Sequence, residues 1–205
     1  MKVKTFGNNP LNQNTYIYYN PDTNQGILID AGMSSHDILQ GVSGITIVGI
    51  LLTHGHFDHM YSLDQLRQVT KAKAYAHKKE ARLLQEPGLN MSVAGKAEIS
   101  AQADILIEDK EIINFGEISL EVIHTPGHTG GGVCFYHRDN GIIFTGDTLF
   151  KGAIGRTDLP TGDHDTILAS IKNRLMVLPQ DTIVYPGHGE ATTIGDEKAT
   201  NPFIN

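Results

Sequence analysis

Seven histidine and aspartate residues in this sequence have side chains and spacings that suit metal ions. Four of them lie within the motif THGHFDH at residues 53–59. The other three each follow an apolar, strand-like segment and stand beside glycine. The full set is His54, His56, Asp58, His59, His128, Asp147 and His188. Imidazole nitrogens and carboxylate oxygens both bind zinc and related divalent metals, so the sequence predicts a metal centre.

The spacing of these residues suits two divalent metal ions. Alternate side chains of an extended chain point the same way, which places His54 and His56 about 7 Å apart with room for an ion between them. Asp58 and His59 belong to the turn that enters the next predicted helix, so their side chains diverge toward a second ion. The predicted division is His54, His56 and His128 on one ion, Asp58, His59 and His188 on the other, and Asp147 as the bridge.

Such a centre is suited to hydrolysis. Two ions about 3.5 to 4 Å apart lower the pKa of a shared water toward about 7, which supplies hydroxide at neutral pH. The same cations polarise a substrate carbonyl and stabilise its oxyanion, and Asp58 is placed to orient the hydroxide. Zinc is the default assignment, while iron and manganese accept the same ligands. Asp30 is either an acceptor for the second N–H of a ligand histidine or a plain turn residue.

The other histidines and the single cysteine have no comparable partners along the sequence. Cys134 lies in the alternating segment GVCFYH, where we expect a small buried side chain and no redox role. The remaining histidines are assigned to ordinary surface, strand or capping positions, and they are His36, His77, His124, His137 and His164.

The elements that must position these residues are strands and helices in two similar blocks. Apolar, β-branched runs predict strands at 2–6, 15–20, 26–30, 46–53, 73–77, 105–109, 118–125, 132–137, 141–147 and from 182 onward. Helical spacing predicts helices at 60–69, at 78–85 with its charges outward, and from Asp163 or Asp165 to 178. An Asp-Asn-Gly turn at 139–141 indicates a hairpin. We therefore predict an α/β fold of four layers, αββα, with the ligands at strand ends.

Length and composition limit the other classes of function. A chain of 205 residues suits one domain, residues 1–205. The net charge of −7, with 16 scattered basic residues, argues against a nucleic-acid partner. No apolar run approaches the roughly 18 residues of a membrane span, so we expect no membrane partner. One cysteine and an N-terminus without an apolar leader favour the cytoplasm, and the oligomeric state cannot be predicted from the sequence.

The motifs THGHFDH, TPGHT, TGDT and PGHG occur in the order typical of the metallo-β-lactamase superfamily, which the sequence resembles from end to end. The stretch GDTLFKGAIGRTDLPTGD at 146–163 and NPF at 201–203 resemble compact bacterial glyoxalases II, the hydroxyacylglutathione hydrolases. The resemblance implies the metallo-β-lactamase fold and hydrolysis of S-D-lactoylglutathione or a related thioester. Arg156 falls where long glyoxalases II carry a glutathione-contacting lysine, which implies a substrate-carboxylate contact; its alternative is a loop salt bridge with Asp158.

Two departures from that family and two competing functions stand beside this interpretation. The tyrosine that follows the last ligand histidine in the long enzymes is replaced by Gly189 and Glu190, and their C-terminal glutathione-binding helical domain is missing. Persulfide dioxygenases share HxHxDH but hold a single iron; the segments GRTDL and PGHG favour the hydrolase. A non-catalytic or nucleic-acid-processing member is a third hypothesis, and the nuclease relatives need recognition domains that 205 residues do not accommodate.

Overall fold

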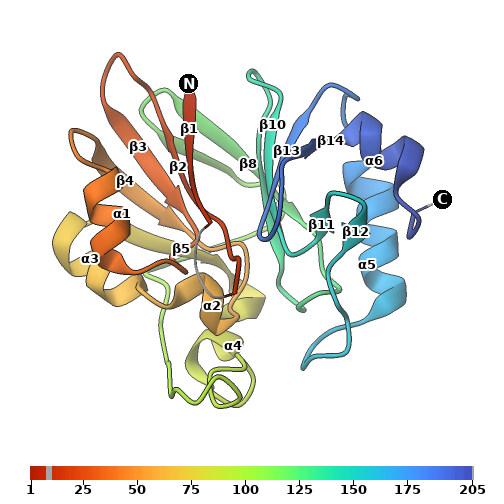
Figure 1. Cartoon of the computed structure of the whole chain (residues 1–205), viewed down its shortest axis with the longest axis horizontal. Coiled ribbons are helices and arrows are strands. Elements are labelled where there is room, and N and C mark those ends of the chain that lie inside the picture. Colours follow the sequence, from red (N-terminus) through yellow and green to blue (C-terminus); the bar gives the residue numbers. More distant parts are fainter. Residues whose placement is uncertain (8–10, 205) are drawn as a thin grey trace.

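The computed structural model describes residues 1–7 and 11–204, and its first half contains a six-stranded sheet (Figure 1). The strands lie in chain order: β1 (Lys2–Phe6), β2 (Thr15–Tyr19), β3 (Gln25–Ile29), β4 (Thr46–Leu51), β5 (Lys73–His77) and β6 (Ile105–Ile107). β1, β2 and β3 are antiparallel, whereas β3 to β6 run parallel. β3 and β4 are apolar over most of their length, and each contributes buried side chains to both faces of the sheet.

A second six-stranded sheet comes from the other half of the chain, in the order β14-β13-β10-β9-β8-β7. Its strands are β7 (Ile112–Phe115), β8 (Ile118–His124), β9 (Val133–His137), β10 (Ile142–Gly146), β13 (Ile183–Pro186) and β14 (Thr192–Thr193). Only the β10–β13 pair is parallel among these described strands. A small hairpin of β11 (Leu149–Phe150) and β12 (Ala153–Ile154) lies between β10 and β13 in the sequence.

Helices cover the outer face of each sheet, so the predicted four-layer αββα architecture is confirmed (Figure 1). α1 (Ser35–Gly41), α3 (Leu63–Thr70) and α4 (Ala81–Gln85) pack on the first sheet. α5 (His164–Ser170) and α6 (Ile194–Thr200) pack on the second. Between the sheets lies an apolar core to which the first sheet contributes Tyr18 and Ile27 and the second contributes Leu120, Phe135 and Phe144.

Local details differ from the sequence prediction at several elements. The helix predicted to extend to residue 178 begins after Asp163, whose side chain caps it by accepting a hydrogen bond from the Thr166 N–H. The α-helix ends at Ser170, and the chain continues as a π-helical turn, Ile171–Leu175. The hairpin at 139–141 is confirmed, with Ile142 opposite His137. Six short elements, α1, α6, β7, β11, β12 and β14, were not predicted, because too few residues carry their pattern. Within the described residues, every helix is too short or too polar to cross a membrane.

Candidate metal centre

The candidate site lies where strands from both sheets end. His54 follows β4, and two residues beyond it the chain enters α2 (Phe57–Met60), a single turn that carries Asp58 and His59. In the second sheet, His128 lies in the loop after β8, Asp147 directly follows β10, and the last candidate ligand, His188, follows β13. The strand ends of two sheets therefore bring together residues that are more than 130 positions apart in the sequence.

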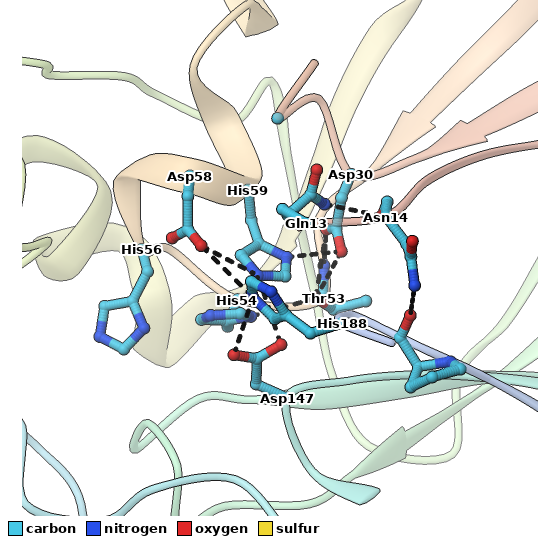
Figure 2. Close-up of polar contacts among 12 residues, drawn as sticks. Gln13, Asn14, Asp30, Thr53, His54, His56, Asp58, His59, Asp147 and His188 are labelled. Carbon is cyan, nitrogen blue, oxygen red and sulfur yellow. Dashed lines mark hydrogen bonds and ion pairs between the residues drawn. The ribbon is translucent and has the colours of Figure 1, made fainter. Parts of the chain in front are cut away.

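All seven predicted ligands meet at this place, and Figure 2 labels six of them, all except His128. They form overlapping groups of three whose ligand atoms lie within 4.8 Å of one another, namely His54, His56 and His128; His54, His59 and Asp147; and Asp58, His59 and His188. The first and third groups are the two sets that the sequence predicted for separate ions. Their assignment as ligands stays a proposal, because proximity alone does not establish binding.

Asp147 lies between the two predicted sets. Its Oδ2 is 3.5 Å from His128 Nε2 and 3.5 Å from His188 Nε2, and its Oδ1 is 3.3 Å from His59 Nε2. His188 Nε2 also lies 3.4 Å from Asp58 Oδ2. Oδ2 therefore faces imidazoles of both predicted sets, and Oδ1 faces the second set, an arrangement that suits a ligand shared by two ions.

The three-imidazole set offers unprotonated nitrogens. Burial lowers the pKa of His56 to about 3, with the neighbouring His128 imidazole adding to the effect. Burial also lowers the pKa of His54 well below its ordinary value, and neighbouring imidazoles, with His59 foremost, lower it further. Neutral imidazole is the form that binds a metal, so these two side chains are already in the binding state at neutral pH.

The carboxylates create the opposite environment beside them. Burial alone would lower the pKa of His59, but Asp147, Asp30 and Asp58 together raise it well above its ordinary value. Burial would raise the pKa of Asp147, yet His59 and its neighbours hold it well below the usual range. Negative charge is therefore concentrated on one side of the cluster, where cations would be attracted.

Two buried nitrogen atoms supply a test of whether a metal fits. The Nε2 atoms of His54 and His56 are buried and have no hydrogen-bond partner among the described residues. Buried polar atoms nearly always have a hydrogen-bond partner in folded proteins. Without a metal, each of these nitrogens would lose its hydrogen bond to water and gain no other partner. A bound cation satisfies both atoms, so the donor set fits a divalent metal.

Hydrogen bonds behind the cluster hold most of the imidazoles with Nε2 facing inward. His59 Nδ1 donates to Asp30 Oδ2 at 2.8 Å, and His128 Nδ1 donates to the Arg156 carbonyl at 2.8 Å. His188 Nδ1 donates to the Leu11 carbonyl at 3.1 Å. Such partners determine the tautomer and ring orientation of metal-binding histidines.

Asp30 takes the first of the two roles that the sequence left open. Besides His59, its carboxylate accepts hydrogen bonds from the Thr53 N–H and hydroxyl, at 2.8 and 2.9 Å (Figure 2). Thr53 Oγ1 in turn lies 3.1 Å from His54 Nδ1. Asp30 has φ of +60°, a left-handed conformation that is uncommon for a residue with a side chain. Strain at this strand end is consistent with a position selected for its contacts.

Glycine and asparagine allow the loop of His188, the last candidate ligand, to approach the cluster. A Cβ atom at Gly187 would lie 2.1 Å from Asp147 Oδ1, so a side chain is excluded there. Asn14, which precedes β2, donates through Nδ2 to the carbonyls of Pro186 and Gly189 at 3.1 and 2.8 Å. Sequence reasoning anticipated the glycine but missed the asparagine, which carries no local motif.

A cleft of about 340 Å³ opens onto the cluster. Its wall includes Leu11, Phe57, Met91 and Leu159, together with ligand candidates from both sheets. Arg156 also lines the cleft, but its guanidinium pairs with both Asp158 oxygens at 2.7 Å, and about 60% of its side chain is exposed. The structure thus shows the loop salt bridge, in a position where the same arginine borders the cleft.

Glu80 is a buried residue of the site that sequence reasoning missed and placed wrongly. The segment 78–85 was predicted to carry its charges outward, yet the Glu80 side chain points inward and the residue is 1% exposed. Its neighbours Lys78 and Lys79 gave the segment a surface-like composition. The Glu80 carboxylate accepts hydrogen bonds from the two loops that carry Gly55 and Gly131. Packing of the turn, and not the charge pattern of the segment, determines that this side chain points inward.

Comparisons with known proteins identify the family of this chain. The chain matches the sequence profile of the metallo-β-lactamase superfamily over residues 8–188. YqgX of Bacillus subtilis, a probable metallo-hydrolase, is 39% identical over 100% of this chain and 98% of its own length. The hydroxyacylglutathione hydrolase GloC of Haemophilus influenzae is 34% identical over 94% of this chain and 93% of its own length.

Solved structures show the same fold. The B3 metallo-β-lactamase BLEG-1 superposes with a TM-score of 0.95 at 38% identity and 100% coverage of both chains. TTHA1623, in a di-iron-bound form, gives a TM-score of 0.87 at 35% identity, covering 98% of this chain and 99% of the other. ETHE1 from Myxococcus xanthus gives 0.80 at 27% identity, with 98% and 84% coverage. Because the family profile covers most of the chain and relatives above 30% identity span it, this chain belongs to the metallo-β-lactamase superfamily.

Proposed function

We propose that this protein is a dinuclear metal-dependent hydrolase of hydroxyacyl thioesters such as S-D-lactoylglutathione. The observation that carries the proposal is Asp147, whose carboxylate lies between two sets of nitrogen and oxygen donors at one strand-end site. A relative at 34% identity that is described as a hydroxyacylglutathione hydrolase supports the choice of thioester. Zinc is the proposed metal, with iron or manganese as alternatives, since TTHA1623 is described in a di-iron-bound form.

The ligand candidates form two sets, one for each proposed ion. The two sets proposed for the separate ions are His54, His56 and His128, and Asp58, His59 and His188, with Asp147 shared. When bound, two divalent ions supply Lewis acidity toward a thioester carbonyl and make a water molecule more acidic. The protein keeps the imidazoles in register through Asp30 and through the carbonyl acceptors behind His128 and His188.

Asp58 is the proposed catalytic carboxylate. Its Oδ2 faces His188, and the residue lines the cleft while remaining partly accessible. A carboxylate at this border between cluster and cleft can accept a hydrogen bond from the attacking water and orient it toward the thioester carbon. The apolar wall formed by Phe57, Met91 and Leu159 would contact the acyl group and limit access of other water molecules.

Asp58→Ala is expected to lower thioester hydrolysis about a hundredfold, the usual size of a positioned acid or base. The assay measures thiol release from S-D-lactoylglutathione and from a panel of other thioesters, together with metals per chain by elemental analysis. We expect close to two metals per chain in the wild-type protein. Asp64→Ala, which removes an exposed carboxylate on α3, is the matched control and should retain wild-type rates.

A different result would favour the competing chemistry. A single iron per chain, with sulfite formed from glutathione persulfide and no thioester hydrolysis, would contradict the proposal and indicate a persulfide dioxygenase. Both substrates therefore belong in the same experiment.

Arg156→Ala is expected to raise KM for S-D-lactoylglutathione about fivefold while kcat changes less than about twofold. An exposed charge contact is worth about 1 kcal/mol, and a contact made equally in the bound and transition states alters KM rather than kcat. Steady-state kinetics measure both constants. Arg138→Ala, which breaks another exposed pair, with Glu121, serves as control. An unchanged KM would mean that Arg156 serves only its salt bridge with Asp158.

A further inference from the structure

One buried carboxylate joins the two loops that supply the three-imidazole set. Glu80 ends the short turn η1 (Lys78–Glu80) after β5 and is 1% exposed. Its Oε2 accepts a hydrogen bond from the Gly55 N–H at 2.7 Å, and its Oε1 accepts one from the Gly131 N–H at 2.7 Å. Each oxygen therefore holds a different loop.

Both glycines lie close to Glu80, and at Gly131 a side chain would not fit. A Cβ atom at Gly131 would lie 2.6 Å from Oε1 and 2.8 Å from the Glu80 backbone nitrogen. At Gly55 the Cβ atom would lie 3.0 Å from Oε2. Glycine at both positions therefore lets the backbone N–H groups come close enough to hydrogen-bond to the Glu80 carboxylate.

These loops belong to different sheets. Gly55 lies between His54 and His56 after β4, whereas Gly131 lies three residues beyond His128, between β8 and β9. The hydrogen bonds within each sheet do not set the distance between the loops. A backbone hydrogen bond from Val133 N to Thr53 O at 2.9 Å is a second tie between them.

We propose that Glu80 is a positioning residue for the metal set formed by His54, His56 and His128. The inference rests on the proposed metal centre and adds a residue that touches neither ion. A buried carboxylate is costly unless it is hydrogen-bonded, and burial raises the pKa of Glu80. The two N–H donors offset that cost and at the same time hold the ligand loops at the separation at which His56 Nδ1 and His128 Nε2 come within 3.0 Å.

Glu80→Gln isolates this role because it preserves size and burial. An amide has one acceptor oxygen, so its NH₂ group would face a backbone N–H in one of the two loops and break that link. Glu197→Gln is the matched control. Glu197 is also 1% exposed, and its carboxylate accepts from the Gly152 N–H at 2.9 Å and the Thr192 hydroxyl at 2.7 Å, away from the ligand loops.

The experiment titrates metal-free protein with Zn²⁺ against a chromophoric competing chelator, which resolves two binding steps. Glu80→Gln should weaken one step about tenfold, the lower end of the effect of supporting residues around a metal, and leave the other within about twofold. Glu197→Gln should leave both steps unchanged, although thermal melts should show both variants destabilised. Gly131→Ala, which displaces the carboxylate without changing a charge, should weaken the same step as Glu80→Gln.

Wild-type zinc affinity in Glu80→Gln, or an equal loss in both glutamate variants, would overturn the proposal. If Glu80→Gln fails to fold, Gly131→Ala provides the same comparison. The titration contains no thioester, so it separates this inference from the proposed reaction: a protein that binds zinc as described but does not cleave thioesters contradicts only the latter.

Discussion

Replacing Asp147 by asparagine is expected to lower kcat/KM for thioester hydrolysis about a thousandfold and to reduce bound metal to one ion or fewer per chain. The carboxylate faces imidazoles of both predicted sets, so one substitution weakens both ions. Removing a single group that stabilises charge in a transition state costs about 10²- to 10³-fold, and a shared ligand belongs at the upper end of that range. Steady-state kinetics and elemental analysis of the same preparation give both quantities.

The control for this variant is another replacement of aspartate by asparagine, at a residue outside the proposed metal centre. Asp163 caps α5 through its Oδ1, which accepts from the Thr166 N–H at 2.8 Å. Asparagine caps helices about as well as aspartate does, so Asp163→Asn should keep wild-type activity and metal content. Two metals per chain and near-normal rates in Asp147→Asn would show that this carboxylate does not bridge the ions.

Removing the metals should abolish hydrolysis and lower the melting temperature by about 10 to 20 °C. Each ion present at a hundred times its Kd stabilises the folded state by about 2.7 kcal/mol, so two ions contribute about 5 kcal/mol. For a chain of this size each kcal/mol shifts the melting temperature by about 2 to 4 °C. Calorimetry of chelated and zinc-reconstituted protein measures the shift.

Reconstitution distinguishes loss of metal from damage to the protein. Dialysis followed by Zn²⁺ should restore both activity and melting temperature, whereas Mg²⁺, which prefers oxygen ligands, should restore neither. Full hydrolysis of thioesters by the chelated protein would contradict the metal-dependent proposal.

The ligand candidates were predictable because their signal is local and repeated. HxHxDH places four donors in six residues, and the other three each follow a strand beside glycine, so strand ends alone bring them together. Residues that support the cluster have no such signal. Asp30 could be named but not placed, since its acceptor role depends on where His59 lies. Glu80 was predicted to face outward because Lys78 and Lys79 dominate its neighbourhood, and only tertiary packing buries it.

The fold was predictable where its signal is local and repeated, and not where tertiary packing determines the geometry. Long apolar runs such as residues 46–53 and 118–125 identify the central strands, and the alternation of strands with amphipathic segments identifies the layers. The helix after Asp163 keeps its apolar spacing through Leu175, so periodicity alone predicts a continuous α-helix. The change to a π-helical turn after Ser170 shifts side chains by a fraction of a turn, which a pattern of buried positions does not distinguish.

At the proposed metal centre, ligands drawn from both sheets would give this chain a reversible substitute for a disulfide. The sequence has one cysteine, Cys134, which is buried, so no covalent cross-link within the chain can join its halves. His59 of the first half and Asp147 of the second would share ions instead, closing a loop of nearly ninety residues. Unlike a disulfide, that closure would depend on metal supply rather than on redox potential, so the strength with which the two halves are held together would vary with the concentration of free metal.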